Sequence, residues 1–225
     1  MPLNVERVRA ICFDVDGTLS DTDDVFTGRL AKIIKPFHFL FPKRDTEKIA
    51  RRLVMASEAP ANFLMGIPDF LGLDKPLGWM FDKVSRFIGH KPKKNFLLIA
   101  GVREMLQDLS RRYPLSVVSV RDARSTMAFL EQYHLLPFFS CIATSQTCRH
   151  TKPYPDQILW VAERLGQRPE ACLMVGDTTV DMRAGKSAGA QAVGVLCGFG
   201  EEAELHKNGA DMILYSTADL AQVLE

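Results

Sequence analysis

The stretch VRAICFDVDGTL, residues 8–19, changes character sharply in its middle. Residues 8–13 are mostly apolar and β-prone, whereas Asp14, Asp16 and Gly17 end that pattern. A short apolar run that stops at Asp and Gly is typical of a buried strand that meets a loop. We therefore predict a first strand over residues 8–13, with two carboxylates at its carboxyl end.

From residue 102 onward, helical and strand-like patterns alternate. The periodicity predicts helices over 102–112, 123–133, 155–165 and 180–188, and strands over 115–118, 140–143, 172–175, 192–196 and 211–214. Strands joined by helices form right-handed crossovers in a parallel sheet with both faces covered. The predicted fold class is therefore α/β, a doubly wound, Rossmann-like parallel sheet.

Residues 21–96 lack this alternation. Helical patterns over 23–35, 46–57 and 77–88 are separated by Pro and Gly, which predicts an inserted, mainly α-helical domain between core segments 1–20 and 97–225. The insert carries 14 Lys and Arg against 9 Asp and Glu, net +5 (14 − 9), which favours an anionic ligand or, equally, a solvated basic helix face. Arg51, Arg52 and Asn62 are candidates for substrate contacts in it.

The composition argues against several classes of protein. The 225 residues are 47% hydrophobic, which suits a globular protein with a sizeable core. Because 28 Lys and Arg face 27 Asp and Glu, the net charge is only +1, without a basic field for nucleic acid or an anionic membrane. The longest apolar run, residues 96–102, is far shorter than the ~20 residues of a membrane-spanning helix. We expect neither a nucleic-acid nor a membrane partner.

The N-terminal residues and the cysteines bear on the cellular location. The charged first residues lack the apolar segment of a signal peptide. The five cysteines form no C-x-x-C pair, which indicates reduced thiols. We expect a cytoplasmic protein that is a monomer or a homodimer.

Polar residues follow four of the predicted strands. Ligands of an open parallel sheet bind beyond the carboxyl ends of its strands, so these residues are expected at one edge. They are residues 14–18, Ser119, residues 151–153 with Lys152, and residues 176–181.

The carboxylates in these clusters predict a metal site. Two like charges ~4 Å apart repel by roughly 4 kcal/mol at an effective dielectric constant near 20, and a cation relieves that repulsion. Oxygen ligands without His or Cys favour a hard ion, here Mg²⁺. The metal-ligand candidates are Asp14, Asp16, Asp177 and Asp181.

The other polar residues at these strand ends are suited to bind and transfer a phosphoryl group. Lys152 and Ser119 are suited to bind phosphoryl oxygens through a point charge and a hydroxyl donor. Hydrolysis of phosphate monoesters is among the slowest uncatalysed reactions, which favours covalent catalysis by a carboxylate. Asp14 is the candidate nucleophile, and Asp16, two residues later, the candidate acid and base.

The ordered motifs resemble those of haloacid dehalogenase-like (HAD) hydrolases with a helical cap after the first motif, in the phosphoglycolate phosphatase-like branch. The matching segments are residues 14–19, Ser119, Lys152 and residues 176–181, and an Ala-Gly signature follows at 184–190. The resemblance covers essentially the whole chain. It implies that Asp14 is nucleophile and Mg²⁺ ligand, and that the backbone carbonyl of Asp16 also binds Mg²⁺. It further implies that Asp177 is the third protein ligand and that Asp181 orients metal-bound water.

The same resemblance assigns the phosphoryl-binding residues. It implies that Thr18 helps hold Asp16, that Ser119 binds phosphoryl oxygens and that Lys152 neutralises Asp14 and the transferring group. The family commonly has Asn after the motif-two hydroxyl, whereas this chain has Val120 and Arg121. The backbone N–H of Val120 remains suited to phosphate, and Arg121 or the cap is the candidate for the missing side-chain contact.

The expected function is therefore a Mg²⁺-dependent phosphatase that hydrolyses a small phosphorylated metabolite through an aspartyl-phosphate on Asp14. The family's dehalogenases lack the second acid, so Asp16 argues against that activity. A sugar phosphomutase, which keeps the same motifs, stays open. A catalytically weak phosphometabolite-binding protein is the third alternative, although a pure binder has no need of Asp16.

Overall fold

The computed structural model describes residues 2–21 and 96–225. Apart from its two end residues, the predicted cap domain, 21–96, lies outside the described residues, and so do Arg51, Arg52 and Asn62. In the two described ranges, no helix combines the length and the apolar character that crossing a bilayer requires.

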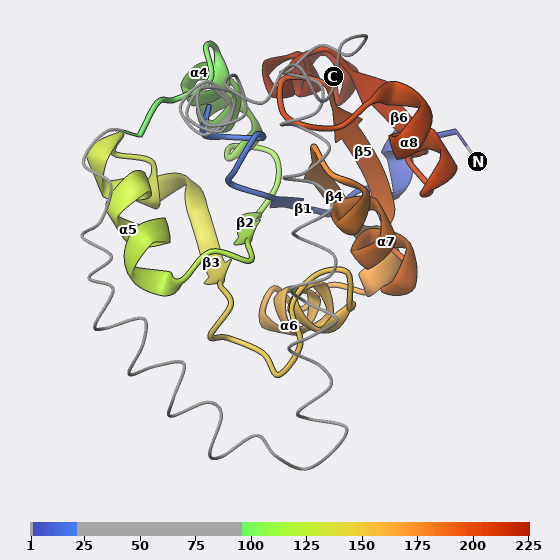
Figure 1. Cartoon of the computed structure of the whole chain (residues 1–225), viewed down its shortest axis with the longest axis horizontal. Helices are drawn as coiled ribbons and strands as arrows, with labels where there is room; N and C mark the ends of the chain where they lie inside the picture. The colour runs from blue at the N-terminus through green and yellow to red at the C-terminus, as the bar shows by residue number, and fades with distance from the viewer. Residues whose placement is uncertain (1, 22–95) are drawn as a thin grey trace, which may run out of the picture. The chain divides into compact units, whose positions relative to one another are not determined.

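A six-stranded sheet, parallel throughout, forms the centre of the described structure, with strand order β3-β2-β1-β4-β5-β6 (Figure 1). The chain runs from β1 outward to β3 and then returns to the other side of β1 for β4. The strand order therefore reverses between β1 and β4, where this class of fold binds its ligands. The strands are β1 Ala10–Phe13, β2 Leu115–Val118, β3 Phe139–Ala143, β4 Cys172–Gly176, β5 Gln191–Val195 and β6 Met212–Leu214.

Helices cover both faces of this sheet, as predicted for a doubly wound fold. Alternate side chains of a strand point to opposite faces. Ile11 and Phe13 pack in one buried cluster with residues of α4 (Val102–Leu109), α5 (Ala123–Gln132) and α9 (Leu220–Val223). Ala10 and Cys12 pack in another with residues of α6 (Asp156–Arg164) and α7 (Thr179–Ser187). The helix α8 (Glu202–Lys207) packs against β5 and β6.

The observed elements differ from the predicted ones mainly at their ends and in two short helices. The first strand begins at Ala10 because Val5–Arg7 forms a 3₁₀ turn in which Val8 N donates to Val5 O at 3.0 Å. The helices α8 and α9, of six and four residues, were not predicted. Helices this short show too little of the 3.6-residue period to be recognised.

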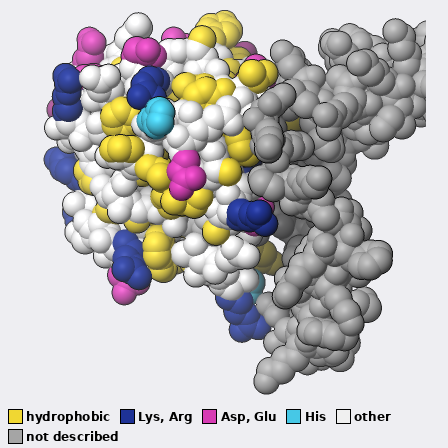
Figure 2. All heavy atoms as spheres, turned by 90° about the vertical axis from the view of Figure 1, so that its left-hand side faces the viewer, with side chains coloured by type: hydrophobic (Ala, Val, Ile, Leu, Met, Phe, Trp, Pro, Cys, Tyr) yellow, Lys and Arg dark blue, Asp and Glu magenta, His cyan; other side chains and the backbone are white. Residues whose placement is uncertain are grey.

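Figure 2 shows the surface on the left-hand side of Figure 1, where α5 and β3 lie, and this surface carries both hydrophobic and charged side chains. Hydrophobic side chains lie there among single charged ones. Four large hydrophobic side chains are exposed in the described residues: Leu97, Tyr154, Leu159 and Tyr215. None of the five cysteines, all of which lie in the described residues, forms a disulfide.

Candidate active site

The ends of β1 and β4 place two predicted site residues beside each other. Asp14 directly follows β1, and Asp177 directly follows β4. Phe13 pairs with Val175, and the amide of Asp14 donates to Val175 O at 3.0 Å. Both carboxylates are buried, at 5% exposure for Asp14 and 0% for Asp177. The point of strand reversal therefore holds two desolvated acids.

Lys152 lies between two of the acids. It comes from the segment between β3 and α6, and its side chain is buried. Its Nζ lies 2.8 Å from Asp14 Oδ1 and 2.6 Å from Asp181 Oδ1. Burial by itself disfavours the ammonium, but the two adjacent carboxylates outweigh it and raise the pKa of Lys152 above its ordinary value. Lys152 is therefore a fixed positive charge beside the predicted nucleophile.

The start of α7 fixes the orientation of Asp181. The Asp181 carboxylate accepts from Thr178 N at 3.0 Å and from Thr178 Oγ1 at 2.6 Å, both through Oδ2. A T-x-x-D sequence at a helix start makes this local contact, which leaves Oδ1 for Lys152. Gly176 permits the approach, since a Cβ there would lie 2.3 Å from Asp181 Cγ. No role of its own was assigned to Thr178 from the sequence, although its T-x-x-D spacing from Asp181 predicts this contact.

Asp177 is held by donors from two segments far apart in the sequence. Phe199 N donates to Oδ2 at 2.8 Å, and Thr18 Oγ1 to Oδ1 at 3.3 Å. The backbone at Gly17 and at Gly198 passes so close that a Cβ at either would lie 2.2 Å from Asp177 Oδ2. Gly17 also has a φ of +71°, which favours glycine. Gly17 therefore permits the turn after β1 and also makes room for Asp177.

The three buried acids fit a divalent cation. Asp14, Asp177 and Asp181 each offer a carboxylate oxygen, and the three oxygens lie within 4.8 Å of one another. Against the single charge of Lys152 they leave a net charge of −2 when ionised (1 − 3). An all-oxygen donor set with excess negative charge suits a hard ion. The Asp16 carboxylate does not belong to this cluster.

The environment of Asp14 favours its protonated form when no cation is bound. Burial raises the pKa of Asp14 to about 7 against the attraction of Lys152, and repulsion from Asp181 and Asp16 adds to the shift. A cation beside the carboxylate favours the ionised form, which is the nucleophilic one. A cation held by these acids would therefore lower the pKa of Asp14.

Arg121 pairs with the predicted acid and base. Its Nε donates to Asp16 Oδ2 at 3.0 Å, and its Nη2 donates to Oδ1. Such a two-point pair fixes the carboxylate more rigidly than a single ammonium contact does. The guanidinium carbon lies 5.1 Å from the centroid of the Phe96 ring, and Nη1 is buried without a hydrogen-bond partner among the described residues. Arg121, predicted to bind substrate, thus lies next to Asp16.

Ser119 and Val120, which were predicted to bind phosphoryl oxygens, follow the end of β2. Ser119 is buried, its amide donates to Ala143 O at 3.0 Å, and its Oγ accepts from Arg121 N at 3.1 Å. Val120 follows it and is half-buried. Thr18, predicted to help hold Asp16, donates to Asp177 as described above.

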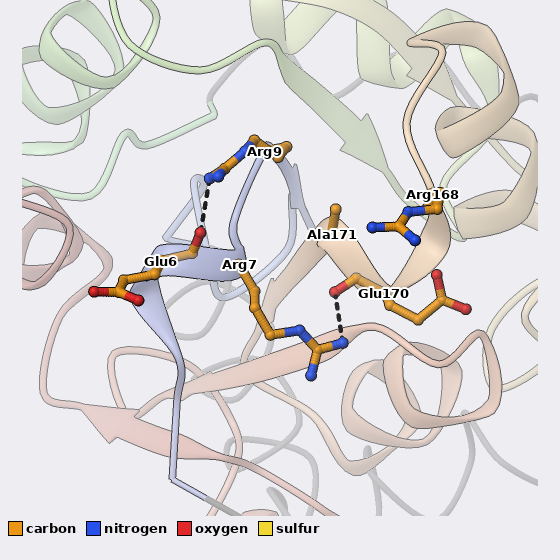
Figure 3. Close-up of a pocket in the computed structure, with 6 residues that line it drawn as sticks. All are labelled: Glu6, Arg7, Arg9, Arg168, Glu170 and Ala171. Carbon is orange, nitrogen blue, oxygen red and sulfur yellow. Dashed lines mark hydrogen bonds between the residues drawn. The ribbon is translucent and has the colours of Figure 1, made fainter.

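A pocket lies at the opposite end of the sheet from these residues, where β1 and β4 begin (Figure 3). In Figure 3, Arg9 donates to Glu6 O at 2.8 Å and Arg7 donates to Glu170 O at 3.5 Å. Arg168 also lines it. These arginines are exposed side chains, and none of the predicted site residues lines this pocket.

Residues 11–195 of the chain match the family model described as haloacid dehalogenase-like hydrolase. The phosphoglycolate phosphatase of Escherichia coli O157:H7 is 27% identical over 238 residues, which cover 97% of this chain and 93% of that protein. Pyrophosphatase PpaX of Bacillus pumilus (strain SAFR-032) is 25% identical over 226 residues, which cover 99% of each chain.

The fold is also similar to that of solved structures. A HAD family hydrolase from Deinococcus radiodurans R1, solved with bound phosphate and sodium, superposes with a TM-score of 0.69. The two chains are 24% identical, and the match covers 97% of this chain and 95% of the other.

Proposed function

Because the chain belongs to the haloacid dehalogenase-like hydrolases, we propose that it is a Mg²⁺-dependent phosphatase acting on a small phosphorylated metabolite through an aspartyl-phosphate. The observation that carries the proposal is the buried group in which Lys152 contacts Asp14 and Asp181 beside Asp177. It offers a nucleophile, a cation site and a fixed positive charge at the point of strand reversal.

In the first step, an Asp14 carboxylate oxygen attacks phosphorus. The new bond joins Asp14 to phosphorus, and the bond from phosphorus to the leaving oxygen breaks. Asp16 donates its proton to that oxygen, so an alcohol departs. Arg121 donates one hydrogen bond to each Asp16 oxygen, which holds the carboxyl group in place and leaves each oxygen a second lone pair.

In the second step, water attacks phosphorus and releases Asp14. Asp16 takes a proton from the water, and inorganic phosphate departs while the Asp14 carboxylate is restored. The two steps together consume one water, and Asp16 ends protonated again, with a proton from that water in place of the one that left with the alcohol.

The remaining residues bind the phosphoryl group and the metal. The Ser119 hydroxyl and the Val120 amide donate to phosphoryl oxygens, and Lys152 offsets their charge. Asp14, Asp177 and Asp181, with the backbone carbonyl of Asp16, would hold Mg²⁺. Bound there, the ion would reduce the repulsion between the Asp14 carboxylate and the anionic substrate.

Phosphatase activity is tested by measuring phosphate release from a panel of esters with Mg²⁺ or with EDTA. The panel contains an aryl phosphate, hexose phosphates and, because of the relatives' names, phosphoglycolate and pyrophosphate. We expect release with Mg²⁺ from at least one compound and none with EDTA, because the excess negative charge of the site then repels the substrate.

The same panel distinguishes the alternatives. Interconversion of hexose phosphate isomers without net phosphate release would replace the proposal by a phosphomutase. Binding of Mg²⁺ and phosphate with neither reaction would replace it by a phosphometabolite-binding protein.

A further inference from the structure

The buried side chain of Gln157 joins the ends of two strands. Its Nε2 donates to Ser119 O and to Thr144 O, at 2.9 Å in each case. Ser119 directly follows β2, Thr144 directly follows β3, and Gln157 lies in the first turn of α6. Its side chain is 0% exposed. One amide thus connects three separate elements at the carboxyl edge of the sheet.

These hydrogen bonds determine which end of the amide faces the strands. Carbonyl oxygens only accept, so the NH₂ group must face both of them. The Oε1 of Gln157 is buried and has no hydrogen-bond partner among the described residues. A buried acceptor without a partner is unfavourable, whereas methionine would fill similar space without that penalty. The two donated hydrogen bonds therefore explain why an amide is suited to this place.

The helix that carries Gln157 continues directly from the segment that carries Lys152. Only four residues separate the two, and Tyr154 N closes a turn there by donating to Thr151 O at 3.0 Å. Movement of α6 relative to β2 would therefore change the place of Lys152 relative to Ser119. The hydrogen bond from Gln157 to Ser119 O opposes that movement.

We propose that Gln157 is a positioning residue that sets the spacing between Ser119 and Lys152. The inference rests on the proposed function, in which both of these residues interact with the phosphoryl group. A misplacement on the order of 1 Å is enough to slow a reaction about 100-fold. Gln157 does not itself touch the phosphoryl group.

The test uses Gln157→Met, which keeps the length of the side chain and removes both donors. The dissociation constant of inorganic phosphate is measured by calorimetry with Mg²⁺, together with kcat and KM. We expect Gln157→Met to weaken phosphate binding and lower kcat/KM about 10- to 100-fold. Gln157→Asn keeps the NH₂ group on a shorter side chain and is expected to lie between Met and wild type. It also serves if the Met variant does not fold.

Gln191→Met is the matched control. Gln191 is nearly buried, at 8% exposure, and its Nε2 donates to Asn4 O at 2.9 Å. It opens β5 at the opposite end of the sheet. We expect this variant to lower the unfolding temperature much as Gln157→Met does, without changing phosphate affinity. Loss of folded protein lowers kcat but leaves the dissociation constant unchanged, so the two effects are separable.

The outcomes separate this inference from the proposed function. A Gln157→Met or Gln157→Asn protein that melts early but binds phosphate like wild type overturns the inference. A wild type that binds no phosphate overturns it as well. If wild type binds phosphate but hydrolyses no ester, the proposed function fails, while weaker phosphate binding by Gln157→Met still supports the positioning role.

Discussion

Asp14→Asn is expected to abolish turnover, with kcat reduced on the order of 10³- to 10⁶-fold. The amide is neutral and a poor nucleophile, so no phosphoryl group is transferred to residue 14. The decrease should appear with every substrate that wild type hydrolyses, because it removes the step that all of them share. Steady-state kinetics with Mg²⁺ measures it.

A stability measurement distinguishes loss of the chemical step from loss of folded protein. The Asp14 pKa of about 7 lies above its ordinary value of 3.8, so the folded protein binds more protons than the unfolded one in that interval. Without metal, the contribution of Asp14 to the unfolding free energy should therefore decrease as the pH rises from about 4 to 7, and it appears as the difference between wild type and Asp14→Asn. Asp14→Asn lacks this dependence and should be at least as stable at pH 7. Asp108→Asn, at an exposed pair with Arg112, is the control with normal turnover. An Asp14→Asn protein that turns over like this control would contradict the assignment.

Lys152→Met is expected to impair both stability and activity. The substitution leaves Asp14 and Asp181 buried without the cation that lies 2.8 and 2.6 Å from them. Removing one partner of a buried ion pair typically costs about 3–5 kcal/mol of unfolding free energy. Turnover should also fall, because the charge that offsets the phosphoryl oxygens is lost. Denaturant unfolding and steady-state kinetics measure the two effects.

Lys186→Met provides the comparison for that prediction. Lys186 also lies 2.9 Å from an acid, Asp211, but its side chain is 41% exposed. The Asp211 side chain is 4% exposed but keeps the hydrogen bond from Ala192 N at 2.8 Å when Lys186 is replaced, so this variant should lose less stability than Lys152→Met. The double variant Asp14→Asn with Lys152→Met should regain part of the lost stability and none of the activity. Equal stability losses in the Lys152→Met and Lys186→Met variants would contradict the account.

The acids of the site were predictable because of a property of parallel sheets. All strands present their carboxyl ends at one edge, so Asp14 and Asp177 come together wherever β1 and β4 are neighbours. Asp181 follows from the same reasoning, since it lies in the first turn of the helix after β4. Once the strands are recognised in the sequence, the location of these three acids at the carboxyl edge of the sheet can be predicted.

The side-chain pairs across the site were not predictable in the same way. Arg121 and Asp16 are 105 residues apart, and the long Arg side chain has many rotamers that reach other partners. Gln157 is a polar residue at a buried position of α6, where an amphipathic pattern places apolar residues. Its partners are backbone carbonyls, which every residue has, so the identities of Ser119 and Thr144 do not indicate these contacts.

Trapping the phosphoryl group on the protein tests the central claim most directly. In an Asp16→Asn variant supplied with an aryl phosphate, the phenolate leaves without a proton, so the first step proceeds. The second step lacks its base, and the covalent intermediate should accumulate. After acid quenching, peptide mapping by mass spectrometry should place a hydroxylamine-sensitive phosphoryl group on Asp14. Release of the phenol with the phosphoryl group on another residue, or on none, would contradict the account.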